Sequence, residues 1–262
     1  MHTRLGRLAA TAVGALALVT APTRAHAQVS TISCLSPVQC TLTELFAGGS
    51  IQVDDKHFKN WGLEHLDASA GAVPNLSLIM VGGISSLADP DPNKPGPGIR
   101  FFGNGQLAIS GVQYLDLRID FRVAVTAPGN QIKDATAQFQ SIAGIGKSII
   151  RFNEFLTNNT GSIGLGQLVL ARDFAFPPVI PAPTSDNILF PPQANDVYAE
   201  KNFYLEGTQP GDSAQIDQLD QRYSQMPEPG ELLMLGCGSA LLVLLSRRRA
   251  RRANHPSVGG IS

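Results

Sequence analysis

The chain has 262 residues and a formal net charge of −1, but the 12 basic and 19 acidic residues between Gln28 and Met226 give that region a charge of −7. An acidic region without a basic stripe argues against binding of nucleic acid or another polyanion through bulk charge. About 200 residues are enough for one core the size of a β-sandwich or barrel, so we expect a single domain.

Residues 1–27 have the features of a secretory signal peptide. Arg4 and Arg7 make the start of the chain basic, and Leu8–Ala21 is apolar and rich in alanine. Signal peptidase accepts small residues before the cut, and the expected cleavage site comprises Ala25, Ala27 and Gln28. A retained N-terminal membrane helix is disfavoured because the apolar run is short and Pro22 follows it directly. We therefore expect the chain to be exported.

Export to an oxidising compartment favours a disulfide between Cys34 and Cys40, which five residues separate. A loop this small contributes roughly 2 kcal/mol in the chain-entropy model, less any strain. Two free thiols are the alternative. The third cysteine, Cys237, lies in an apolar stretch near the C-terminus and is expected to leave with it.

One short helix is expected near the start of the mature region. Thr41 and Glu44 have the spacing of a capping box, and Gly48 supplies a stop after the helix. The apolar side of this helix is formed by Leu42, Leu45 and Phe46. Ser50–Val53 then has the composition of a strand.

Along the rest of the mature region, apolar residues recur with period two rather than the helical period of about 3.6. In Leu115–Val125, apolar residues alternate with Asp116, Arg118, Asp120 and Arg122, which predicts a strand with one buried and one solvated face. Further strands are expected at Leu76–Val81, Ile99–Phe102, Gln106–Ser110, Asp134–Gln140, Ser148–Phe155, Gln167–Asp173 and Asp196–Leu205.

Turn-forming residues separate these segments, for example Gly82-Gly83 and Asn104-Gly105. Short strands joined by such turns predict an all-β fold, an antiparallel β-sandwich-like ectodomain over residues 28–206 with one short N-terminal helix. The prolines between Pro177 and Pro192 predict an extended loop rather than sheet interior. Residues 207–225 are expected to hold a last strand, around Ala214–Tyr223, followed by a tether.

Two glycine-containing segments resemble nucleotide-binding loops without matching them. Gly144–Ser148 ends like a phosphate-binding loop, but that pattern needs glycine where the chain has Ser141. The order of Gly161, Gly164 and Gly166 is wrong for a dinucleotide fingerprint. Turns between strands explain both segments better. The sequence also has no Gly-x-Ser-x-Gly elbow, and we expect no cofactor.

The densest polar cluster spans residues 54–67 and holds His57 and His65, the only histidines of the mature region. A two-histidine metal site would have to form here, but an eight-residue separation is not a known ligand spacing on one helix or hairpin. We prefer a solvated loop beside a buried Trp61, and predict no metal site.

Two pairs of carboxylates invite comparison with calcium or glycosidase sites. Asp89 and Asp91 lie in a proline-rich turn, where calcium binding is an alternative to a plain loop. Asp116 and Asp120 lie on the polar face of the expected strand, where solvation explains them. No catalytic residue is predicted from either pair.

The C-terminal region combines three features in a fixed order. The first is a proline-stiffened motif made by Pro227, Glu228, Pro229 and Gly230. The second is an apolar stretch, Leu232–Leu245, which as a helix spans roughly 21 Å, against a bilayer core of about 30 Å. The third is a basic stop made by Arg247, Arg248, Arg249, Arg251 and Arg252. Basic clusters stay in the cytoplasm, so the chain before the motif is expected to face outward.

This order of features resembles the PEP-CTERM sorting signal that bacterial exosortases recognise, here over residues 226–252, with 253–262 as a disordered tail. Gly230 and Glu231 stand where that family usually has small hydroxyl residues. The resemblance implies signal peptidase and exosortase as processing partners, transient contact with the inner membrane and exopolysaccharide as a candidate partner. It also implies a place in the cell envelope, at the cell surface or in the extracellular matrix. An ordinary one-span anchor with a proline-rich neck is the alternative.

Short segments of the mature region also resemble exported PEP-CTERM proteins, namely Leu45–Ile51, Asp55-Lys56 with Phe58, Ile132–Ala135, Ile216–Gln218 and Tyr223–Gln225. Such proteins are β-rich and of undetermined activity, so this resemblance implies fold and export but no active site.

Two classes of function remain open after the sequence analysis. The leading one is an exported, envelope- or matrix-associated, non-enzymatic β-domain protein sorted through its PEP-CTERM signal. The alternative is an envelope-localised enzyme acting on polysaccharide, or a calcium- or carbohydrate-binding module. A sandwich offers precedent for these activities, but the sequence shows no constellation of residues that would carry them.

Overall fold

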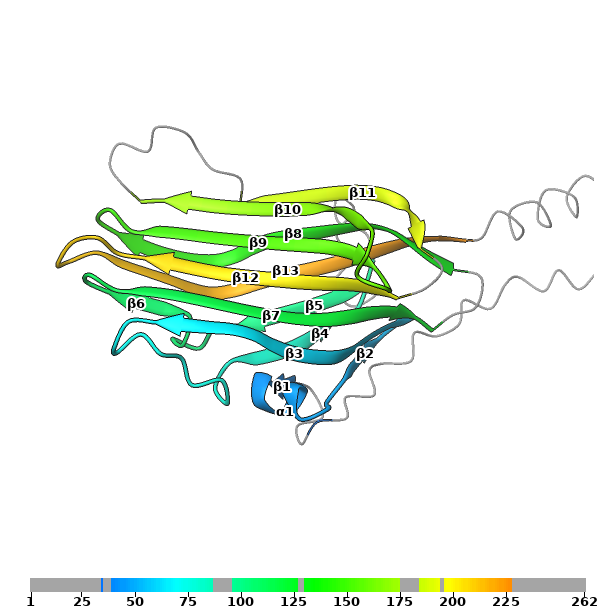
Figure 1. The fold of residues 1–262 in the computed structure, drawn as a ribbon, viewed down its shortest axis with the longest axis horizontal. Helices are drawn as coiled ribbons and strands as arrows, with labels where there is room; N and C mark the ends of the chain where they lie inside the picture. The colour runs from blue at the N-terminus through cyan, green and yellow to red at the C-terminus, as the bar shows by residue number, and fades with distance from the viewer. Residues whose placement is uncertain are drawn as a thin grey trace, which may run out of the picture.

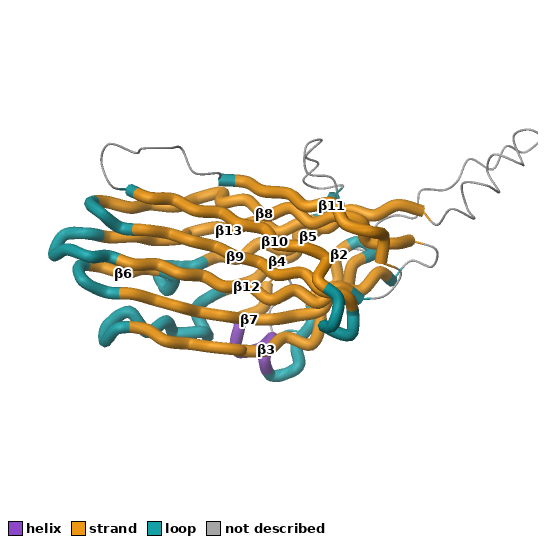
Figure 2. Tube along the Cα trace, turned by 45° about the horizontal axis from the view of Figure 1, so that its top comes forward, coloured by secondary structure: helices purple, strands orange, loops and turns teal. Residues whose placement is uncertain are grey.

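The structure is a computed structural model in which residue 34 and residues 39–86, 96–126, 130–174, 184–193 and 196–227 are described. These residues form two antiparallel sheets that lie one behind the other (Figure 1) and one short helix. Loops and turns gather at the two ends of the strands (Figure 2). The predicted all-β, antiparallel, sandwich-like fold with a short N-terminal helix is therefore confirmed.

The first sheet has six strands, β2 (Ile51–Val53), β3 (Lys56–Ala68), β7 (Tyr114–Val125), β9 (Ile149–Asn158), β10 (Gly164–Asp173) and β12 (Val197–Glu206). Their order across the sheet is β10-β9-β12-β7-β3-β2, and every neighbouring pair is antiparallel. This six-stranded sheet faces the viewer in Figure 1.

The second sheet has seven strands, β1 (Gln39–Thr41), β4 (Met80–Ile84), β5 (Gly98–Phe102), β6 (Ala108–Ser110), β8 (Asn130–Ile145), β11 (Ser185–Gln193) and β13 (Ser213–Pro227). Their order is β1-β4-β5-β13-β8-β11, and β6 also pairs with β13. The last strand in the sequence, β13, thus lies inside the sheet between β5 and β8, and both neighbours run antiparallel to it.

Period-two alternation explains why these segments form strands. In β12 every second residue, from Val197 to Leu205, is buried, and the residues between them are partly exposed. In β7 the predicted apolar residues all face the core, which confirms the alternation read from Leu115–Val125. The inward faces of the two sheets together bury the apolar side chains that hold the sandwich together.

Aromatic rings fill the middle of the sandwich, where they contact one another in a chain made by Phe58, Trp61, Phe101, Phe121, Phe139, Phe152, Phe203 and Tyr223. The centroids of the Trp61 and Phe121 rings are 4.3 Å apart in a stacked arrangement. Such pairs stabilise a core by about 0.5–1.5 kcal/mol beyond the burial of their area.

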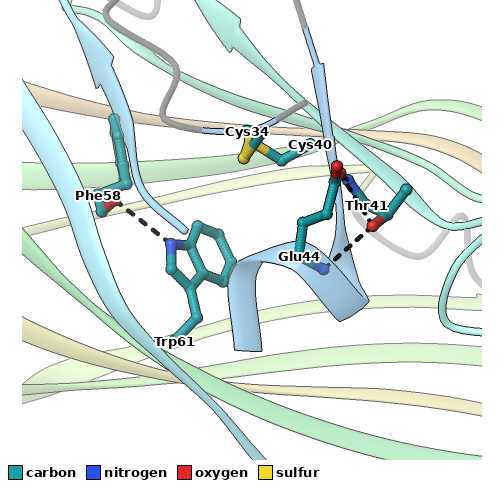
Figure 3. Close-up of a disulfide and its surroundings, with 6 residues drawn as sticks. All are labelled: Cys34, Cys40, Thr41, Glu44, Phe58 and Trp61. Carbon is teal, nitrogen blue, oxygen red and sulfur yellow. Dashed lines mark hydrogen bonds between the residues drawn. A yellow bond between two sulfur atoms is a disulfide. The ribbon is translucent and has the colours of Figure 1, made fainter. Parts of the chain in front are cut away.

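The N-terminal helix α1 (Leu42–Phe46) follows β1 and begins at the predicted capping box. Thr41 Oγ1 accepts a hydrogen bond from the Glu44 backbone N–H at 3.1 Å, and the Thr41 N–H donates to Glu44 Oε2 at 2.7 Å. A disulfide joins Cys34 to Cys40, the pairing that the sequence favoured, directly before this cap (Figure 3). The disulfide and the cap together fix the chain where it enters the sandwich.

Several predicted boundaries differ from the structure, and Gly82-Gly83, expected as a turn, lies inside β4. The strand expected at Leu76–Val81 is wrong at its start, because residues 76–78 form a turn and β4 begins at Met80. The cause is the side chain of Asn75, whose Oδ1 accepts hydrogen bonds from the N–H and the hydroxyl of Ser77 and so favours a turn.

The loop expected over the prolines is also partly wrong, because Pro191 and Pro192 belong to β11. This strand lies at the end of its sheet and pairs with β8 alone, and its register shifts between Leu189 and Gln193. An edge strand tolerates residues that have no N–H to donate. The other prolines of that stretch, at 177–183, lie outside the described residues.

The predicted solvated loop beside Trp61 is wrong, because this segment is the 13-residue strand β3, although Trp61 is buried as expected. The register against β7 shifts between Lys59 and Gly62 and again between Leu63 and His65. Asn60 lies at the first shift and has a φ of 55°, in the left-handed region of the backbone. Each shift exchanges the face that the next residues occupy, so β3 has no continuous alternation.

The signal peptide, the apolar stretch Leu232–Leu245, the arginine cluster and the tail at 253–262 lie outside the described residues. Within the part of the chain that the structure describes, no helix has the length and apolar character needed to cross a membrane. Strand β13 continues past Tyr223 to Pro227, so the last strand reaches the first proline of the predicted sorting motif.

Candidate functional site

The outward side chains of the six-stranded sheet form a polar face with aromatic residues among them, which we call the outer face. Strand pairing across β9, β12 and β7 sets these side chains in lateral rows. In order along the strands, the rows are Thr157, Tyr198 and Arg122; Phe155, Glu200 and Asp120; Asn153, Asn202 and Arg118; and Arg151, Tyr204 and Asp116. Phe155 is 47% exposed, so an aromatic ring is available to a ligand on this face.

Asp120 lies at the centre of a polar cluster on the outer face. The Tyr198 hydroxyl donates a hydrogen bond to its carboxylate, and Glu64 is a further neighbour of both groups. Burial, with the charge of Glu64 acting in the same direction, raises the pKa of Asp120 above its ordinary value of 3.8. Burial and the nearby Asp120 carboxylate raise the pKa of Tyr198, so this hydroxyl remains a donor at neutral pH.

The outer face also holds polar atoms that lack a hydrogen-bond partner among the described residues, namely Asp120 Oδ1, Thr157 Oγ1 and Asn202 Oδ1. Opposite Asp120 on β3 lies Gly62, and a Cβ atom added there would meet Asp120 Oδ1 at 2.2 Å. The Asp120 carboxylate therefore occupies the space over Gly62. Solvation, the explanation expected for Asp120 from its place on a strand's polar face, is wrong because this residue is only 9% exposed.

A second candidate site lies between the two sheets and consists of four residues that we call the core network: Glu154, Lys201, Gln221 and Tyr223. Lys201 on β12 and Glu154 on β9 are fully buried, and Lys201 Nζ lies 2.8 Å from Glu154 Oε1. From the opposite sheet, Gln221 Oε1 accepts a hydrogen bond from Lys201 Nζ at 2.8 Å. The Tyr223 hydroxyl donates to Glu154 Oε1, also at 2.8 Å.

The core network is enclosed by apolar groups, and its electrostatics follow from that burial. Lys201 Nζ lies 4.9 Å from the ring centroid of Phe121 and 5.3 Å from that of Phe152. Burial lowers the pKa of Lys201 to about 8, although the charge of Glu154 opposes the shift. Burial and Glu154 raise the pKa of Tyr223 well above its ordinary value, which keeps its hydroxyl a donor.

Two atoms of the core network have no hydrogen-bond partner among the described residues, Glu154 Oε2 and Gln221 Nε2. An unsatisfied buried polar atom costs about 1–3 kcal/mol, and a buried ion pair recovers its desolvation penalty only with well-satisfied geometry. The core network thus stabilises the interior less than well-packed apolar side chains in the same space would.

A related arrangement joins β3 to the same strand β13. Lys56 is fully buried and donates a hydrogen bond to Gln225 Oε1, and its Nζ lies 2.9 Å from Asp55 Oδ1. Burial lowers the pKa of Lys56, while the charge of Asp55 opposes that shift. The Asp55 side chain is 17% exposed, so this pair is more open to water than the core network.

The sequence analysis did not predict the core network, because two of its charged residues occupy inward positions of strands that alternation alone assigns to apolar side chains. Lys201 takes an inward position in the alternation of β12, and Glu154 takes one in that of β9. Opposite charges at apolar positions of two strands were the signal that was available. Gln221 and Tyr223 give a weaker signal, because β13 alternates less regularly and has three register shifts against β8.

The structure does not bring the predicted metal candidates together. His57 and His65 both lie on β3, opposite Ala124 and Arg118 of β7. No group of three or more histidine, cysteine or acidic residues suited to a metal ion occurs among the described residues. Asp89 and Asp91 lie outside the described residues, as do Glu228, Pro229 and Gly230 of the sorting motif, the cleavage-site residues Ala25, Ala27 and Gln28, and the arginine cluster.

In the segment Gly144–Ser148, Gly144 and Ile145 end β8, and residues 146–148 form the turn to β9 that was expected there. Gly146 has a φ of 76°, and the Lys147 N–H donates to Asp212 Oδ1 at 2.8 Å. The Asp212 carboxylate therefore accepts the hydrogen bond from the Lys147 N–H. In a phosphate-binding loop, such an N–H would donate to the bound phosphate. Ser148 Oγ is likewise engaged, since it donates to the carbonyl oxygens of Ile145 and Ser213.

No protein-family model and no curated protein matches this sequence. One similar solved structure is TmCBM61 in complex with β-1,4-galactotriose, at 9% identity and a TM-score of 0.23, covering 64% of this chain and 88% of the other. Another comes from work on promiscuous carbohydrate-binding modules of the β-sandwich superfamily, at 10% identity and a TM-score of 0.23, covering 64% and 56%. Arabinose-bound MgGH51 α-L-arabinofuranosidase matches at 16% identity and a TM-score of 0.25, covering 64% and 23%. TM-scores this low carry no functional inference.

Proposed function

We propose that this protein is an exported, non-enzymatic β-sandwich that is sorted to the cell envelope or matrix by its C-terminal PEP-CTERM signal. The signal peptide at 1–27 and the signal at 226–252 bracket the described domain and define its route. An exosortase recognises the motif around Pro227 and cuts the chain there. The folded sandwich is then displayed at the surface or released into exopolysaccharide.

One structural observation supports this proposal above others. Strand β13 ends at Pro227, and its pairing with β8 extends to that residue, opposite Asn130. The described sheet and the proposed signal at 226–252 thus share only Met226 and Pro227, the last two residues of β13. A processing enzyme that removes the signal takes away no residue of the sheet before Pro227, so the cargo keeps its fold after processing.

Mapping of both termini by mass spectrometry tests the sorting proposal in cells that have or lack an exosortase. We expect a mature N-terminus at Gln28 in both strains, and a C-terminus close to Gly230 only where exosortase is present. A Glu228→Gln variant is expected to keep its tail, while a Glu206→Gln variant is expected to be processed normally. An intact tail in both strains would overturn the proposal.

A second candidate function is carbohydrate binding by the outer face, and a specific feature favours it. Rings of Phe155, Tyr198 and Tyr204 lie among amide and guanidinium groups on one regular surface. Aromatic rings offer an apolar surface beside a polar edge, which suits ligands that have both kinds of surface.

Affinity electrophoresis through gels that contain the exopolysaccharide of the producing cells tests this second function. We expect the protein to be retarded and the Phe155→Ala and Tyr204→Ala variants to migrate faster than the wild type. The control is Leu189→Ala, which removes a 71% exposed apolar side chain from the other sheet. Equal migration of the wild type with and without polysaccharide would exclude this function.

A further inference from the structure

The core network places an amine next to an amide carbon in a dry interior. Lys201 Nζ is 2.8 Å from Gln221 Oε1, and the C=O bond adds about 1.2 Å, so Nζ lies within about 4 Å of the amide carbon Cδ. Reacting atoms held at about 3–3.5 Å are close to an attack geometry. A small movement of the Gln221 side chain therefore brings the amine into position to attack.

We propose that Lys201 and Gln221 become joined by a covalent amide bond between Nζ and Cδ, with Glu154 carrying the protons. The bond would link β12 of the six-stranded sheet to β13 of the seven-stranded sheet. It is a self-catalysed modification, since every reacting group belongs to this chain. No oxidant, metal or added cofactor takes part.

The atoms and charges of the reaction balance. Glu154 Oε1 takes a proton from Lys201, and the freed electron pair on Nζ attacks Gln221 Cδ to form the new N–C bond. The bond between Cδ and Nε2 then breaks. One hydrogen of Nζ passes through Glu154 to the departing nitrogen, which already has two and leaves as neutral ammonia. A second hydrogen of Nζ stays on Glu154, whose carboxyl group is therefore neutral at the end, and the third remains on the new amide nitrogen.

The unpartnered atoms of the core network are those that the reaction uses. Gln221 Nε2 is the leaving group, and Glu154 Oε2 delivers the proton to it; neither atom has a hydrogen-bond partner among the described residues. The reaction removes the buried ammonium charge and the unsatisfied amide nitrogen, both of which destabilise the interior. Burial also lowers the pKa of Lys201 to about 8, which makes its neutral, nucleophilic form more accessible.

Tyr223 has a positioning role in this scheme. Its hydroxyl donates to Glu154 Oε1, the same oxygen that lies beside Lys201 Nζ. This hydrogen bond fixes the carboxylate between the amine and the opposite sheet. Phe121 and Phe152, whose rings lie beside Nζ, exclude water that would otherwise solvate the ammonium and slow its deprotonation.

The neighbouring pair of Lys56 and Gln225 shows why the proposal is confined to Lys201. Both glutamines come from β13, and both accept a hydrogen bond from a buried lysine of the other sheet. The Asp55 side chain is 17% exposed, whereas that of Glu154 is 0% exposed. Water at Asp55 stabilises the charged amine and carboxylate, so the conditions for attack are met only in the core network.

Peptide mapping of the folded wild-type protein, after reduction and alkylation, tests the cross-link. Linked protein loses one ammonia, about 17 Da, and its acylated Lys201 resists trypsin, so that residues 173–222 appear as one peptide. A second protease that cuts after Glu206 is expected to leave two pieces of this peptide joined. The joined pieces decide the matter, because an N-terminal Gln28 also loses ammonia when it cyclises and the intact mass alone is ambiguous.

Variants separate the roles of the residues. Glu154→Gln is expected to abolish the link and to restore cleavage after Lys201, while Glu200→Gln, one residue before Lys201 but on the outer face, is expected to leave the link intact. Gln221→Met removes the acceptor with little change in volume and provides an unlinked reference. Circular dichroism establishes that each variant is folded.

The wild type alone is sufficient to overturn the proposal. Folded wild-type protein whose Lys201 is cut by trypsin, and whose peptide 202–222 has its full mass, excludes the bond. A link found between Lys56 and Gln225 with Lys201 unmodified would also contradict it. A link that persists at full yield in folded Glu154→Gln protein would remove Glu154 from the mechanism.

Discussion

At the scale of single residues, the burial of Asp120 makes the stability of the folded protein depend on pH. Burial raises its folded-state pKa above 3.8, so the folded protein holds this proton more tightly than the unfolded chain does. The resulting stabilisation is present below pH 3.8 and is lost as the pH rises through the folded-state pKa. At neutral pH the charged carboxylate, whose Oδ1 has no hydrogen-bond partner among the described residues, is therefore a source of instability.

The Asp120→Asn substitution is expected to raise the free energy of unfolding at pH 7 by about 1 kcal/mol, near the lower limit for an unsatisfied buried polar group. The gain should shrink as the pH falls toward 3.8, because Asp120 then becomes neutral as well. Urea unfolding across this pH range measures both quantities. Asp116→Asn, on the same strand and face, is the control and should change stability by about 0.5 kcal/mol or less, since its partner Arg118 is exposed. A gain that does not depend on pH would contradict this account.

Gly62 is the residue that makes room for Asp120. A methyl group at this position would lie 2.2 Å from Asp120 Oδ1, closer than real contacts allow, so the carboxylate would have to move. We expect Gly62→Ala to lower the free energy of unfolding by about 1–2 kcal/mol, as overpacking usually does. Gly164→Ala is the control, since nothing lies within 4 Å of a Cβ there. In an Asp120→Ala background the loss should largely vanish, which a double-mutant cycle by urea unfolding would reveal. If Gly62→Ala lowers the free energy of unfolding equally in the Asp120→Ala background, the added methyl group clashes with a different residue.

At the scale of elements, helix α1 depends on its first hydrogen bonds because it has only five residues. Thr41 supplies the side-chain half of the capping box, and removal of such a cap costs about 1 kcal/mol. We therefore expect Thr41→Ala to lower the free energy of unfolding by about that amount. Thr43→Ala, at an exposed helix position, should have little effect or a slightly favourable one. Thermal unfolding compares the two, and equal effects would show that the cap is not what holds this helix.

Local sequence patterns predict some of the strands and miss others. The strand β7 and the helix cap follow local rules, alternation in one case and a three-residue spacing in the other, so both were predictable. The strand β3 was not, because two register shifts against β7 interrupt its alternation and a local pattern gives no sign of the partner strand. The core network is similar. Lys201 and Gln221 meet only because the two sheets pack face to face, and that contact depends on tertiary structure.

At the scale of the whole molecule, β13 unites the features on which the proposals depend. It pairs with β5 and β8, it supplies Gln221 and Tyr223 to the core network, and it ends at Pro227. A load applied at the C-terminus, by a membrane before processing or by an attachment after it, therefore acts directly on a central strand. A covalent bond from Gln221 to the other sheet would stop that strand from sliding out of the sandwich.

The central position of β13 predicts a sharp dependence of folding on where the chain ends. Ile216, Leu219 and Tyr223 are each 0% exposed. At about 1.5–3 kcal/mol for each large buried side chain, they contribute an amount comparable to the total stability of a domain, about 5–15 kcal/mol. A chain of residues 28–227 is therefore expected to unfold cooperatively, whereas one of residues 28–212 should show no cooperative transition.

A chain of residues 50–227 is the control for this truncation, because it loses β1 and α1 from the edge of the fold instead of a strand from its middle. It should still unfold cooperatively, at a lower urea concentration than the longer chain. Circular dichroism during urea unfolding measures all three chains. Cooperative unfolding of residues 28–212 would show that the sandwich does not need β13. The proposal that processing near Pro227 releases a domain that needs the whole of β13 would then lose its physical basis.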